Sequence, residues 1–569
     1  MPNPILFVLD DEVESLHKVE RELLRRYGDD YDVLTETSSS VALQRLEALV
    51  ADGREVVVVF ADLESPEMQG ADFLMRIHDL MPEAKRALLV DLGNISCAGT
   101  LLQALTFGQA DNYITKPFET PDEQFHRAVT ELLEEWARAH RQQFELVRII
   151  GEQWSPRSYE LRDALTRSGI PGAFYDVNSE EGRGLLKAVD QLPPQKLPVC
   201  VLYNAEVLID PSFVEFDEAI GVSTHPEEKL YDLAIVGAGP AGLSAAVYGA
   251  SEGLETVVVE RDTPGGQAGT SSLVRNYLGF PRGISGSDLM MQAYRQAWLF
   301  QAEFVFARDA VGLRANGAER EVVLSNGEVI RAKTVLLCPG IAYRRLGIDA
   351  IDRLVGMGVY YGTAVSEAQA MRGKHVYIVG AGNSAGQAAL HLARYASRVT
   401  MLVRGASMAA SMSTYLIQEI EASRRIEVRL HTEVIDGRGE HILEGLVLQN
   451  KSTGAVEKVD AGALFILIGG EPYTGWLPPA IQRDRQGYIL TGRDLAMGGG
   501  SPDSWPLARA PLPLETSVPG VFAAGDARHG APKRIASAVG EGSVAIRHAH
   551  EYLAELESGR VPVSAGGLA

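Results

Sequence analysis

Short runs of apolar residues recur along the chain, and three of them near its start end in charged side chains. A continuous apolar run of roughly four to eight residues is typical of a buried strand in a parallel sheet. The runs and the residues that end them are Ile5–Leu9 with Asp10 and Asp11, Val56–Ala61 with Asp62, and Asp111–Thr115 with Lys116. Because the carboxyl ends of parallel strands meet at one edge, we expect the acids to converge and to hold Mg²⁺. Taken singly, each acid is also consistent with a solvated strand end.

The periodicity changes after this first region. Residues 120–144 carry charged and apolar side chains at helical spacing, which predicts a connector helix over 123–145. The pattern then predicts a smaller α/β domain, with strands at 146–150, 174–177 and 197–202 and a helix at 158–168.

Two strand–turn–helix units with glycine-rich turns follow. The strand 230–236 runs into Gly237, Gly239 and Gly242, and the strand 374–379 runs into Gly380 and Gly382 followed by Asn383, Ser384 and Ala385. Glycines at these positions let the backbone approach a pyrophosphate, and the N-terminus of the following helix favours negative charge. The two units therefore predict two dinucleotide sites. The alternative for each is a glycine turn in some other α/β fold.

The strand that follows each unit ends in a charged residue. Glu260 follows the strand 256–259 and would accept hydrogen bonds from a ribose. Arg404 follows the strand 398–403 and offers a bidentate site for the 2′-phosphate of NADPH. NADPH is therefore favoured, while NADH remains possible. The alternative for Arg404 is a solvated side chain at a strand end.

Composition narrows the classes of function. The 569 residues are 46% hydrophobic and 22% charged, which is typical of a folded multidomain protein, and the net charge of −22 disfavours nucleic acid as a partner. No apolar run approaches the ~20 residues that span a bilayer, and the first residues lack a basic segment before a long apolar one. We expect a cytoplasmic protein.

Cysteine is scarce in the sequence. Cys97, Cys200 and Cys338 lie far apart, which suits a reducing compartment and excludes a disulfide framework. Cys200 falls in an apolar run, where a small core residue is favoured over a lone reactive thiol. A core role is favoured for Cys338 as well.

Residues 1–122 resemble the receiver domain of bacterial response regulators, which has a flavodoxin-like fold. The matching residues are Asp10 and Asp11 for the metal, Asp62 for phosphorylation, Pro66 and Gly70 in the loop after it, and Lys116. The resemblance implies Mg²⁺, a histidine kinase as partner, and Tyr113 as the switch residue. The chain departs from the family at Val90, where a Ser or Thr binds the new phosphoryl group, and Asp91 follows. The alternative is a receiver domain kept for packing or dimerisation.

Residues 146–226 resemble the glutaredoxin and thioredoxin fold. The resemblance rests on Trp154, on the window Ser155-Pro-Arg-Ser158, and on Pro198, which we expect to follow a cis peptide bond. The family's active-site cysteines fall on Ser155 and Ser158. Because a serine hydroxyl neither ionises usefully at neutral pH nor forms a disulfide, we interpret the domain as an interaction or spacer module.

The chain from residue 230 to about 555 resembles the low-molecular-weight thioredoxin reductases, in which one nucleotide-binding unit is inserted within another. The further residues that carry this resemblance are Gly266, Gln267, Asn276, Gly525, Asp526, Arg534, Ile535 and Ala536, with Gly469, Pro472 and Thr474 at the return crossing. The family usually has Gln in place of Ile535.

The resemblance to thioredoxin reductases implies FAD as a cofactor. It places Asp526 on the ribityl chain, Gln267 and Asn276 along the flavin, and the backbone of residues 534–536 at the pyrimidine end of the ring. A helix over 537–553 is expected to begin beside the flavin and to offer its positive end to the reduced form. The family usually dimerises through its FAD domains, so a homodimer is expected.

The expected fold class is α/β, with a receiver domain, a thioredoxin-like domain and two nested Rossmann-type domains. The expected boundaries are 1–122 for the receiver domain, 123–145 for the connector and 146–226 for the thioredoxin-like domain, then 230–349 and 464–557 for FAD, 350–463 for NAD(P)H and 558–569 for a tail.

The redox-active dithiol of the thioredoxin reductases falls on Thr363 and Ser366, which carry no sulfur. We therefore expect an FAD-dependent NAD(P)H oxidoreductase that passes a hydride from NADPH to FAD and then to an external acceptor. That acceptor would be a quinone, dioxygen, or a ferredoxin-like or redoxin protein, with regulation by phosphorylation of the receiver domain. Two alternatives stay open: a flavin-based redox sensor with little turnover, and a thioredoxin-disulfide reductase that uses an external dithiol.

Overall fold

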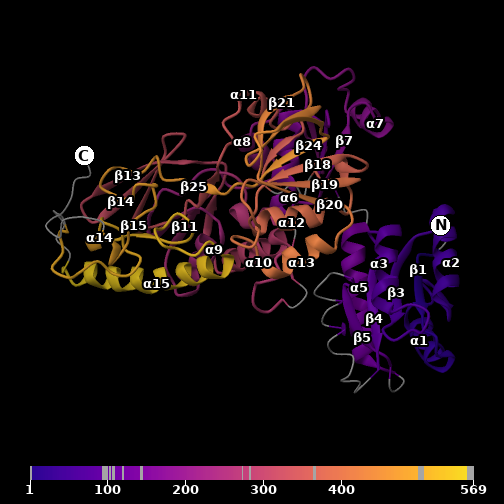
Figure 1. Cartoon of the computed structure of the whole chain (residues 1–569). Helices are drawn as coiled ribbons and strands as arrows, with labels where there is room; N and C mark the ends of the chain where they lie inside the picture. The colour runs from indigo at the N-terminus through magenta and orange to yellow at the C-terminus, as the bar shows by residue number, and fades with distance from the viewer. Residues whose placement is uncertain are drawn as a thin grey trace. The chain divides into compact units, whose positions relative to one another are not determined.

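The computed structural model describes residues 3–91, 100–101, 104, 109–117, 121–140, 145–271, 273–280, 283–362, 367–497 and 505–560 (Figure 1). The chain divides into two compact units. The first comprises Met1–Gln143 with Ser413–Arg424, a stretch that contains helix α13 (Thr414–Ala422). The second comprises Phe144–Met412 with Arg425–Ala569.

The first unit is built on a parallel sheet of five strands in the order β2-β1-β3-β4-β5. The strands are β1 (Ile5–Leu9), β2 (Asp32–Glu36), β3 (Val56–Asp62), β4 (Lys85–Val90) and β5 (Asn112–Thr115). This strand order is the one that flavodoxin-like folds share. The sequence pattern predicted β1, β3 and β5 and did not predict β2 and β4.

Among the residues that the structure describes, the helices beside this sheet include α1 (Val13–Tyr27), α2 (Ser39–Ala51), α3 (Gly70–Leu80) and α5 (Glu123–His140). Helix α5 occupies the region expected to form a connector. Its Phe125, Val129, Leu132 and Trp136 are buried in the same hydrophobic cluster as Leu6 of the sheet. Helix α5 is therefore part of the core of the first unit, since burying its apolar face against the sheet removes that face from water.

The second unit begins with a four-stranded sheet in the order β7-β6-β8-β9. Its strands are β6 (Val147–Gly151), β7 (Gly172–Asp176), β8 (Val199–Leu202) and β9 (Val207–Ile209), and its helices are α6 (Pro156–Ser168), α7 (Glu180–Ala188) and α8 (Phe213–Ala219). β7 is parallel to β6, whereas β8 is antiparallel to β6 and to β9. The Leu197–Pro198 peptide bond is cis, as the sequence predicted.

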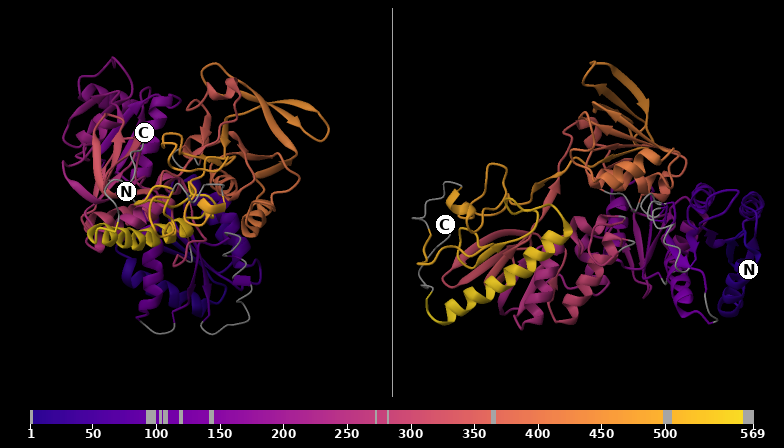
Figure 2. Two further views of the ribbon diagram at one scale, coloured as in Figure 1. Left: turned by 90° about the vertical axis from the view of Figure 1, so that its left-hand side faces the viewer. Right: turned by 60° about the horizontal axis from the view of Figure 1, so that its bottom comes forward.

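The larger sheet of the second unit has seven strands, in the order β12-β11-β10-β15-β14-β13 with β26 beside β15. The strands are β10 (Leu230–Val236), β11 (Thr256–Val259), β12 (Glu303–Val305), β13 (Ala310–Asn316), β14 (Glu319–Leu324), β15 (Val329–Leu337) and β26 (Val521–Ala523). Its helices are α9 (Pro240–Ser251), α10 (Gly286–Leu299), α14 (Asp494–Met497) and α15 (Ile535–Glu557), with the 3₁₀ turn η2 (Gly266–Thr270). α15 runs beside α9 (Figures 1 and 2).

A third sheet lies in the segment between β15 and β26, in the order β17-β24-β18-β19-β20. Its strands are β17 (Val359–Tyr361), β18 (His375–Val379), β19 (Arg398–Val403), β20 (Ile426–Leu430) and β24 (Ala463–Ile466), with α11 (Asp349–Asp352), η3 (Gln369–Met371) and α12 (Asn383–Leu392). An antiparallel sheet of β21 (Thr432–Arg438), β22 (Gly445–Asn450) and β23 (Val456–Asp460) follows β20.

The chain enters and leaves this third sheet through a two-stranded antiparallel link. β16 (Ile341–Tyr343) leads in, and β25 (Gly470–Pro472) leads back and pairs with it. One sheet is thus inserted within the other, as the sequence predicted. Because β24 pairs with β17 and β18, the return crossing falls a few residues after the boundary expected at 464.

None of the helices in the described part of the chain is both long enough and apolar enough to cross a membrane.

Candidate functional site

The first glycine turn lies between β10 and α9. A Cβ atom on Gly237 would lie 2.2 Å from the carbonyl oxygen of Cys338, and one on Gly242 would lie 1.8 Å from the carbonyl oxygen of Gly237. Gly237 also has a φ of +102°. By contrast, no protein atom lies within 4 Å of the position of a Cβ on Gly239. Gly237 and Gly242 are therefore required by packing, and Gly239 leaves the backbone open to a ligand, which fits a pyrophosphate at the N-terminus of α9.

Glu260 follows β11 and faces the same turn. Its Oε2 accepts a hydrogen bond from the Ala238 amide at 2.6 Å, and its Oε1 accepts one from the Asp262 amide at 3.0 Å. Burial is the main cause that raises the pKa of Glu260, and Asp262 adds to it. The carboxylate therefore stabilises the turn through these two hydrogen bonds, a role that the sequence did not indicate. Its remaining lone pairs can accept a hydrogen bond from a ribose hydroxyl.

The segment 266–276 was predicted to lie along the flavin. Gly266 has a φ of +51°, and a Cβ there would lie 3.4 Å from the Cα of Gly239, so η2 begins at the first turn. The Gln267 side chain donates a hydrogen bond to the carbonyl of Ile341 in β16. Asn276 is exposed on its loop. The structure thus brings Gly266 to the turn and ties Gln267 to the link between the two sheets.

The C-terminal part of the second unit reaches the same turn. A Cβ on Gly525 would lie 3.1 Å from the Cβ of Ala241, and the Gly525 amide donates a hydrogen bond to Oε2 of Glu541 at 2.8 Å. Burial raises the pKa of the neighbouring Asp526. The nearby His529 pairs with Asp484, with its Nδ1 at 2.7 Å from Oδ2, and its side chain is 45% exposed.

The predicted helix over 537–553 is α15, which begins at Ile535 with Arg534 as its N-cap. The amides of Ile535 and Ala536 therefore lie in the first turn, where backbone N–H groups have no partner within the helix. That position fits the donor role which the resemblance gives to residues 534–536.

The second glycine turn lies between β18 and α12. A Cβ on Gly380 would lie 2.4 Å from the carbonyl oxygen of Leu467. Gly382 is the N-cap of α12, and the nearest atom to a Cβ there is the Ser411 carbonyl oxygen at 3.9 Å. Asn383, Ser384 and Ala385 form the first turn of the helix. This arrangement repeats the first turn and fits a second pyrophosphate.

Arg404 is exposed directly after β19, the strand next to β18. A guanidinium at this strand end fits an extra phosphate group on a ribose, because it donates two parallel hydrogen bonds.

The described cysteines are buried in the second unit. Cys200 lies in β8 with an exposure of 0%, and burial raises its pKa to about 12. Cys338 is also buried, and burial raises its pKa. Since the thiolate is the reactive form, neither is a nucleophile at neutral pH, and the predicted core roles are confirmed. Cys97, Thr363 and Ser366 lie outside the described residues.

Ser155 and Ser158 lie at the start of α6, beside the four-stranded sheet. Ser155 is the N-cap of the helix, and Ser158 has an exposure of 0%. The Oγ of Ser158 would lie 2.4 Å from a Cβ on Gly151, which is why that position is a glycine.

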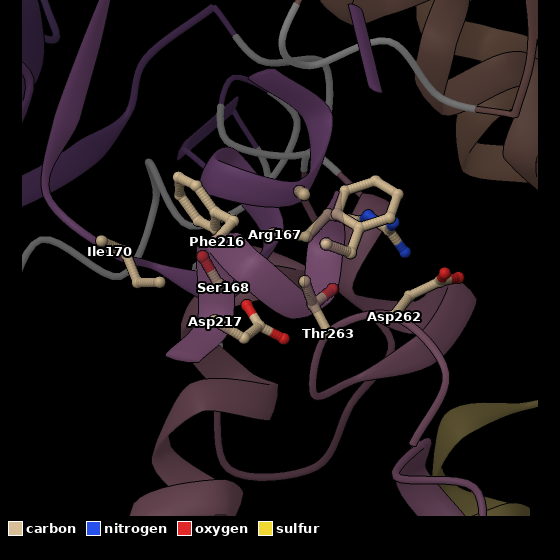
Figure 3. Close-up of a pocket in the computed structure, with 9 residues that line it drawn as sticks. Arg167, Ser168, Ile170, Phe216, Asp217, Asp262 and Thr263 are labelled. Atoms are coloured by element: carbon tan, nitrogen blue, oxygen red, sulfur yellow. The ribbon is translucent and has the colours of Figure 1, made fainter. Parts of the chain in front are cut away.

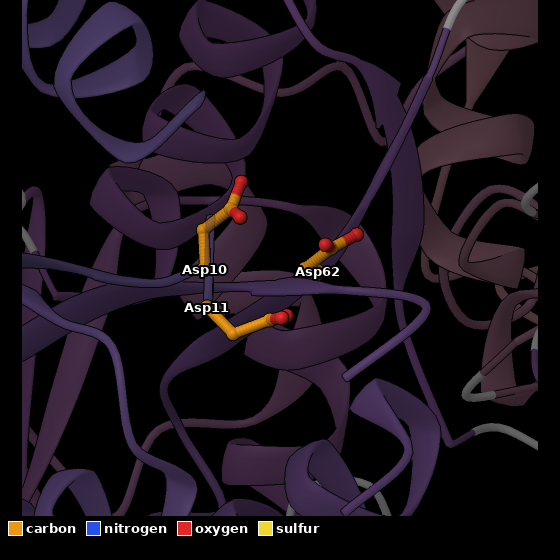
Figure 4. A group of neighbouring side chains, drawn as sticks. All are labelled: Asp10, Asp11 and Asp62. Atoms are coloured by element: carbon orange, nitrogen blue, oxygen red, sulfur yellow. The ribbon is translucent and has the colours of Figure 1, made fainter. Parts of the chain in front are cut away.

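In the first unit, three carboxylates gather at the carboxyl ends of β1 and β3 (Figure 4). One oxygen each of Asp10, Asp11 and Asp62 lies within 4.8 Å of the others. Lys116 places its Nζ 2.9 Å from Oδ2 of Asp10 and 3.1 Å from Oδ2 of Asp62. Burial raises the pKa of Asp62 to about 6, against the lowering effect of Lys116. The donor set fits a hard cation such as Mg²⁺.

Three further positions of the predicted receiver motif are described, namely Val90, Asp91 and Tyr113. Val90 is buried at the end of β4, and the Asp91 carboxylate lies 3.8 Å from Nζ of Lys116. Tyr113 is 47% exposed on β5. The apolar Val90 therefore contributes no donor to this edge of the sheet.

A small pocket lies among α6, α8 and the segment that follows Glu260 (Figure 3). Its polar lining includes Arg167, Asp217, Asp262 and Thr263, and its volume is about 30 Å³. That space suits a water molecule and is too small for a nucleotide. Burial raises the pKa of Asp217 to about 7. The pocket lies where the four-stranded sheet's helices α6 and α8 meet the segment that follows β11.

Comparisons with known proteins agree with this geometry. The family model for pyridine nucleotide-disulphide oxidoreductases matches residues 231–542. Thioredoxin reductase of Bacillus subtilis strain 168 is 31% identical over 334 residues, which are 58% of this chain and 97% of the relative. That of Treponema pallidum strain Nichols is 31% identical over 331 residues, 58% of this chain and 100% of the relative.

Two solved structures give the same result. Lactococcus lactis thioredoxin reductase in its FR conformation aligns with a TM-score of 0.51 at 26% identity, over 57% of this chain and 99% of that one. Thioredoxin reductase of T. acidophilum aligns with a TM-score of 0.51 at 28% identity, over 58% of this chain and 100% of that one.

Two glycines of the first turn provide a matched pair of substitutions. Gly242→Ala should lower the free energy of unfolding of the ligand-free chain by about 1–3 kcal/mol, because its Cβ meets a backbone carbonyl. Gly239→Ala should stay within about 1 kcal/mol of the parent, because its Cβ meets open space. It should instead weaken FAD binding about tenfold or more. Denaturant unfolding and fluorescence titration with FAD measure the two effects, and equal losses of stability would contradict the assignment.

Proposed function

Because the chain belongs to the pyridine nucleotide-disulphide oxidoreductases and is an FAD-dependent NAD(P)H oxidoreductase, we propose that it transfers a hydride from NADPH to FAD and then to an acceptor outside the chain. The observation that carries the proposal is the pair of open glycine turns, at Gly239 and Gly382, on two nested sheets. When it is bound, FAD accepts two electrons as a hydride and can pass them on one or two at a time.

The residues of each turn have separate tasks in this proposal. Gly239, Glu260 and the amides that head α9 would hold the pyrophosphate and ribose of FAD, with Asp526 and the start of α15 toward the flavin end. Gly382 and the first turn of α12 would hold the pyrophosphate of NADPH.

The acceptor is proposed to lie outside the chain because the sequence has no cysteine at 363 and 366, where the resemblance places the dithiol. Thr363 and Ser366 carry no sulfur, and Cys200 and Cys338 are buried with raised pKa values. A quinone, dioxygen, or a ferredoxin-like or redoxin protein would then take electrons from the flavin directly. We propose a homodimer in a cytoplasmic setting as the working form.

Rapid anaerobic mixing with NADPH tests the oxidoreductase directly. The bound FAD should lose its absorbance at the same rate, within about twofold, in the parent and in a Cys97→Ala, Cys200→Ala, Cys338→Ala variant, because sulfur takes no part. Reoxidation by a quinone or by dioxygen should then complete turnover. Tight FAD binding without reduction would favour the redox-sensor alternative, and loss of turnover in the cysteine-free variant would contradict the proposal.

Arg404 is proposed to select NADPH. Arg404→Ala should lower kcat/KM for NADPH about tenfold or more and leave that for NADH unchanged, because only NADPH carries the 2′-phosphate. Arg398, exposed at the other end of β19 and paired with Glu427, offers the control. Arg398→Ala should leave both values unchanged. An unaltered preference in Arg404→Ala would remove the assignment.

The carboxylate cluster of the first unit favours a second proposal, namely that this unit is a receiver domain. Asp10, Asp11 and Asp62 would hold Mg²⁺, and Asp62 would accept a phosphoryl group from a histidine kinase, with Lys116 beside the new charge. The support is the grouping of these four residues on a sheet of order 2-1-3-4-5. Phosphorylation would then regulate the flavoenzyme.

Metal binding tests the receiver proposal. Asp11 is exposed, so Asp11→Asn should keep the fold while weakening Mg²⁺ binding about tenfold or more in isothermal titration, because a charged ligand is lost. Asp30→Asn, an exposed acid elsewhere in the unit, is the control. Beryllofluoride with Mg²⁺ should change the oligomeric state or the rate of flavin reduction in the parent but not in Asp62→Asn. No change in either would favour a domain kept for packing.

A further inference from the structure

Helix α6 of the thioredoxin-like domain begins against the third sheet of the second unit. The Nζ of Lys374 lies 3.6 Å from the centre of the Trp154 ring, at the start of β18. A Cβ on Gly356 would lie 2.6 Å from the Cα of Pro156, the first residue of α6. The end of the domain that carries Ser155 and Ser158 is therefore packed against another part of the chain.

Further along α6, at Arg162, the contact becomes a buried ion pair. An Nη of Arg162 lies 2.9 Å from Oε1 of Glu367, with side-chain exposures of 7% and 0%. Tyr360 of β17 donates a hydrogen bond to the other oxygen of Glu367 at 3.5 Å, and its ring lies 5.1 Å from that of Tyr159. A buried pair of this kind is costly to break, because either partner alone remains an uncompensated charge.

Arg162 is also fixed on its own side of the contact. Its guanidinium donates a hydrogen bond to the Gln153 carbonyl at 3.0 Å and lies 4.4 Å from the centre of the Phe174 ring. Contacts within the thioredoxin-like domain therefore fix the position of the cation that pairs with Glu367.

The other end of α6 meets the larger sheet's domain. The Ser287 hydroxyl at the start of α10 lies 3.3 Å from the Thr166 carbonyl and 3.4 Å from that of Arg167. The pocket between Arg167 and the pair Asp262 and Thr263 lies at the same contact (Figure 3). One helix therefore contacts both nucleotide-binding domains.

Those two domains are joined by a narrow link. β16 and β25 pair over three residues each, from Ile341 opposite Pro472 to Tyr343 opposite Gly470. A two-stranded ribbon by itself is only marginally stable, and domains joined by such segments move relative to each other by default. A second attachment across the two domains would restrict that movement.

We propose that helix α6 is an internal clamp that holds the two nucleotide-binding domains in one relative orientation, with the Arg162–Glu367 ion pair as its main contact to the second domain. This role goes beyond the proposed hydride transfer and gives the dithiol-free thioredoxin-like domain a structural function. Loss of the ion pair would let the second domain turn about the β16–β25 link.

Distance measurements between spin labels test the clamp. Val311 on β13 and Val456 on β23 are exposed, one in each domain, and accept labels as cysteines in the full chain with its native cysteines replaced by alanine. The labelled parent should give one narrow distance distribution. Arg162→Met and Glu367→Gln should broaden it or add a second distance. Glu160→Gln, an exposed acid on the same helix, is the control and should match the parent.

Hydrogen exchange provides the second readout. The amides of Tyr360 and Tyr361 should exchange at least about tenfold faster in Arg162→Met, while those of β6 and β8 keep their protection. Loss of protection in β6 and β8 would mean that Arg162→Met unfolds the domain that carries α6. The test of the clamp then rests on Glu367→Gln, which keeps the shape of the side chain. Parent-like distances and exchange in Glu367→Gln would overturn the clamp. Reduction of FAD by NADPH in the parent is measured separately, so that either proposal can fail alone.

Discussion

The close approach of helix α9 to its two neighbours is the constraint on which the flavin-binding half depends. Gly242 lets α9 approach the carbonyl of Gly237 in the first turn. Gly542 lets α15 approach α9 from the other side, since a Cβ there would lie 2.2 Å from the carbonyl of Ala241. Backbone contact on both sides fixes the start of α9 between the first turn and α15. Segments separated by some three hundred residues therefore meet at one place: Gly239, Gly525 and the start of α15.

Much of this arrangement could be predicted from the sequence, because its signals are local. A strand, a glycine turn and a helix follow one another within each nucleotide-binding unit, so β10, α9, β18 and α12 were foreseen. The sequence likewise predicted that the charged residues at the strand ends, Asp10, Asp62 and Lys116, converge, and the structure brings them together.

What the sequence did not indicate depends on contacts between distant residues. β2 reads Asp-Val-Leu-Thr-Glu and is half-buried throughout, so it lacks a continuous apolar run. Helix α5 shows the expected helical period, but only the structure reveals that Trp136 belongs to the core. The Arg162–Glu367 pair joins residues about two hundred positions apart, and no local pattern marks either partner.

The fate of the electrons follows from the chemistry of sulfur in this chain. The sequence has Thr363 and Ser366 where the family's dithiol falls, and burial raises the pKa of the Cys200 and Cys338 thiols, which keeps them protonated. The four-stranded sheet that begins the second unit has a cis peptide bond before Pro198, and Ser158 of its serine pair is buried. Under the two proposals, this part of the chain contributes through the contacts of α6, and a separate molecule accepts the electrons.

An anaerobic reductive titration tests this central claim most directly, because it counts the electrons that the purified chain can hold. With flavin as the sole intrinsic redox group, the FAD absorbance should disappear after about two electrons per FAD, and no further equivalents should be taken up. Uptake of about four electrons per FAD would reveal a reducible disulfide and would contradict the account.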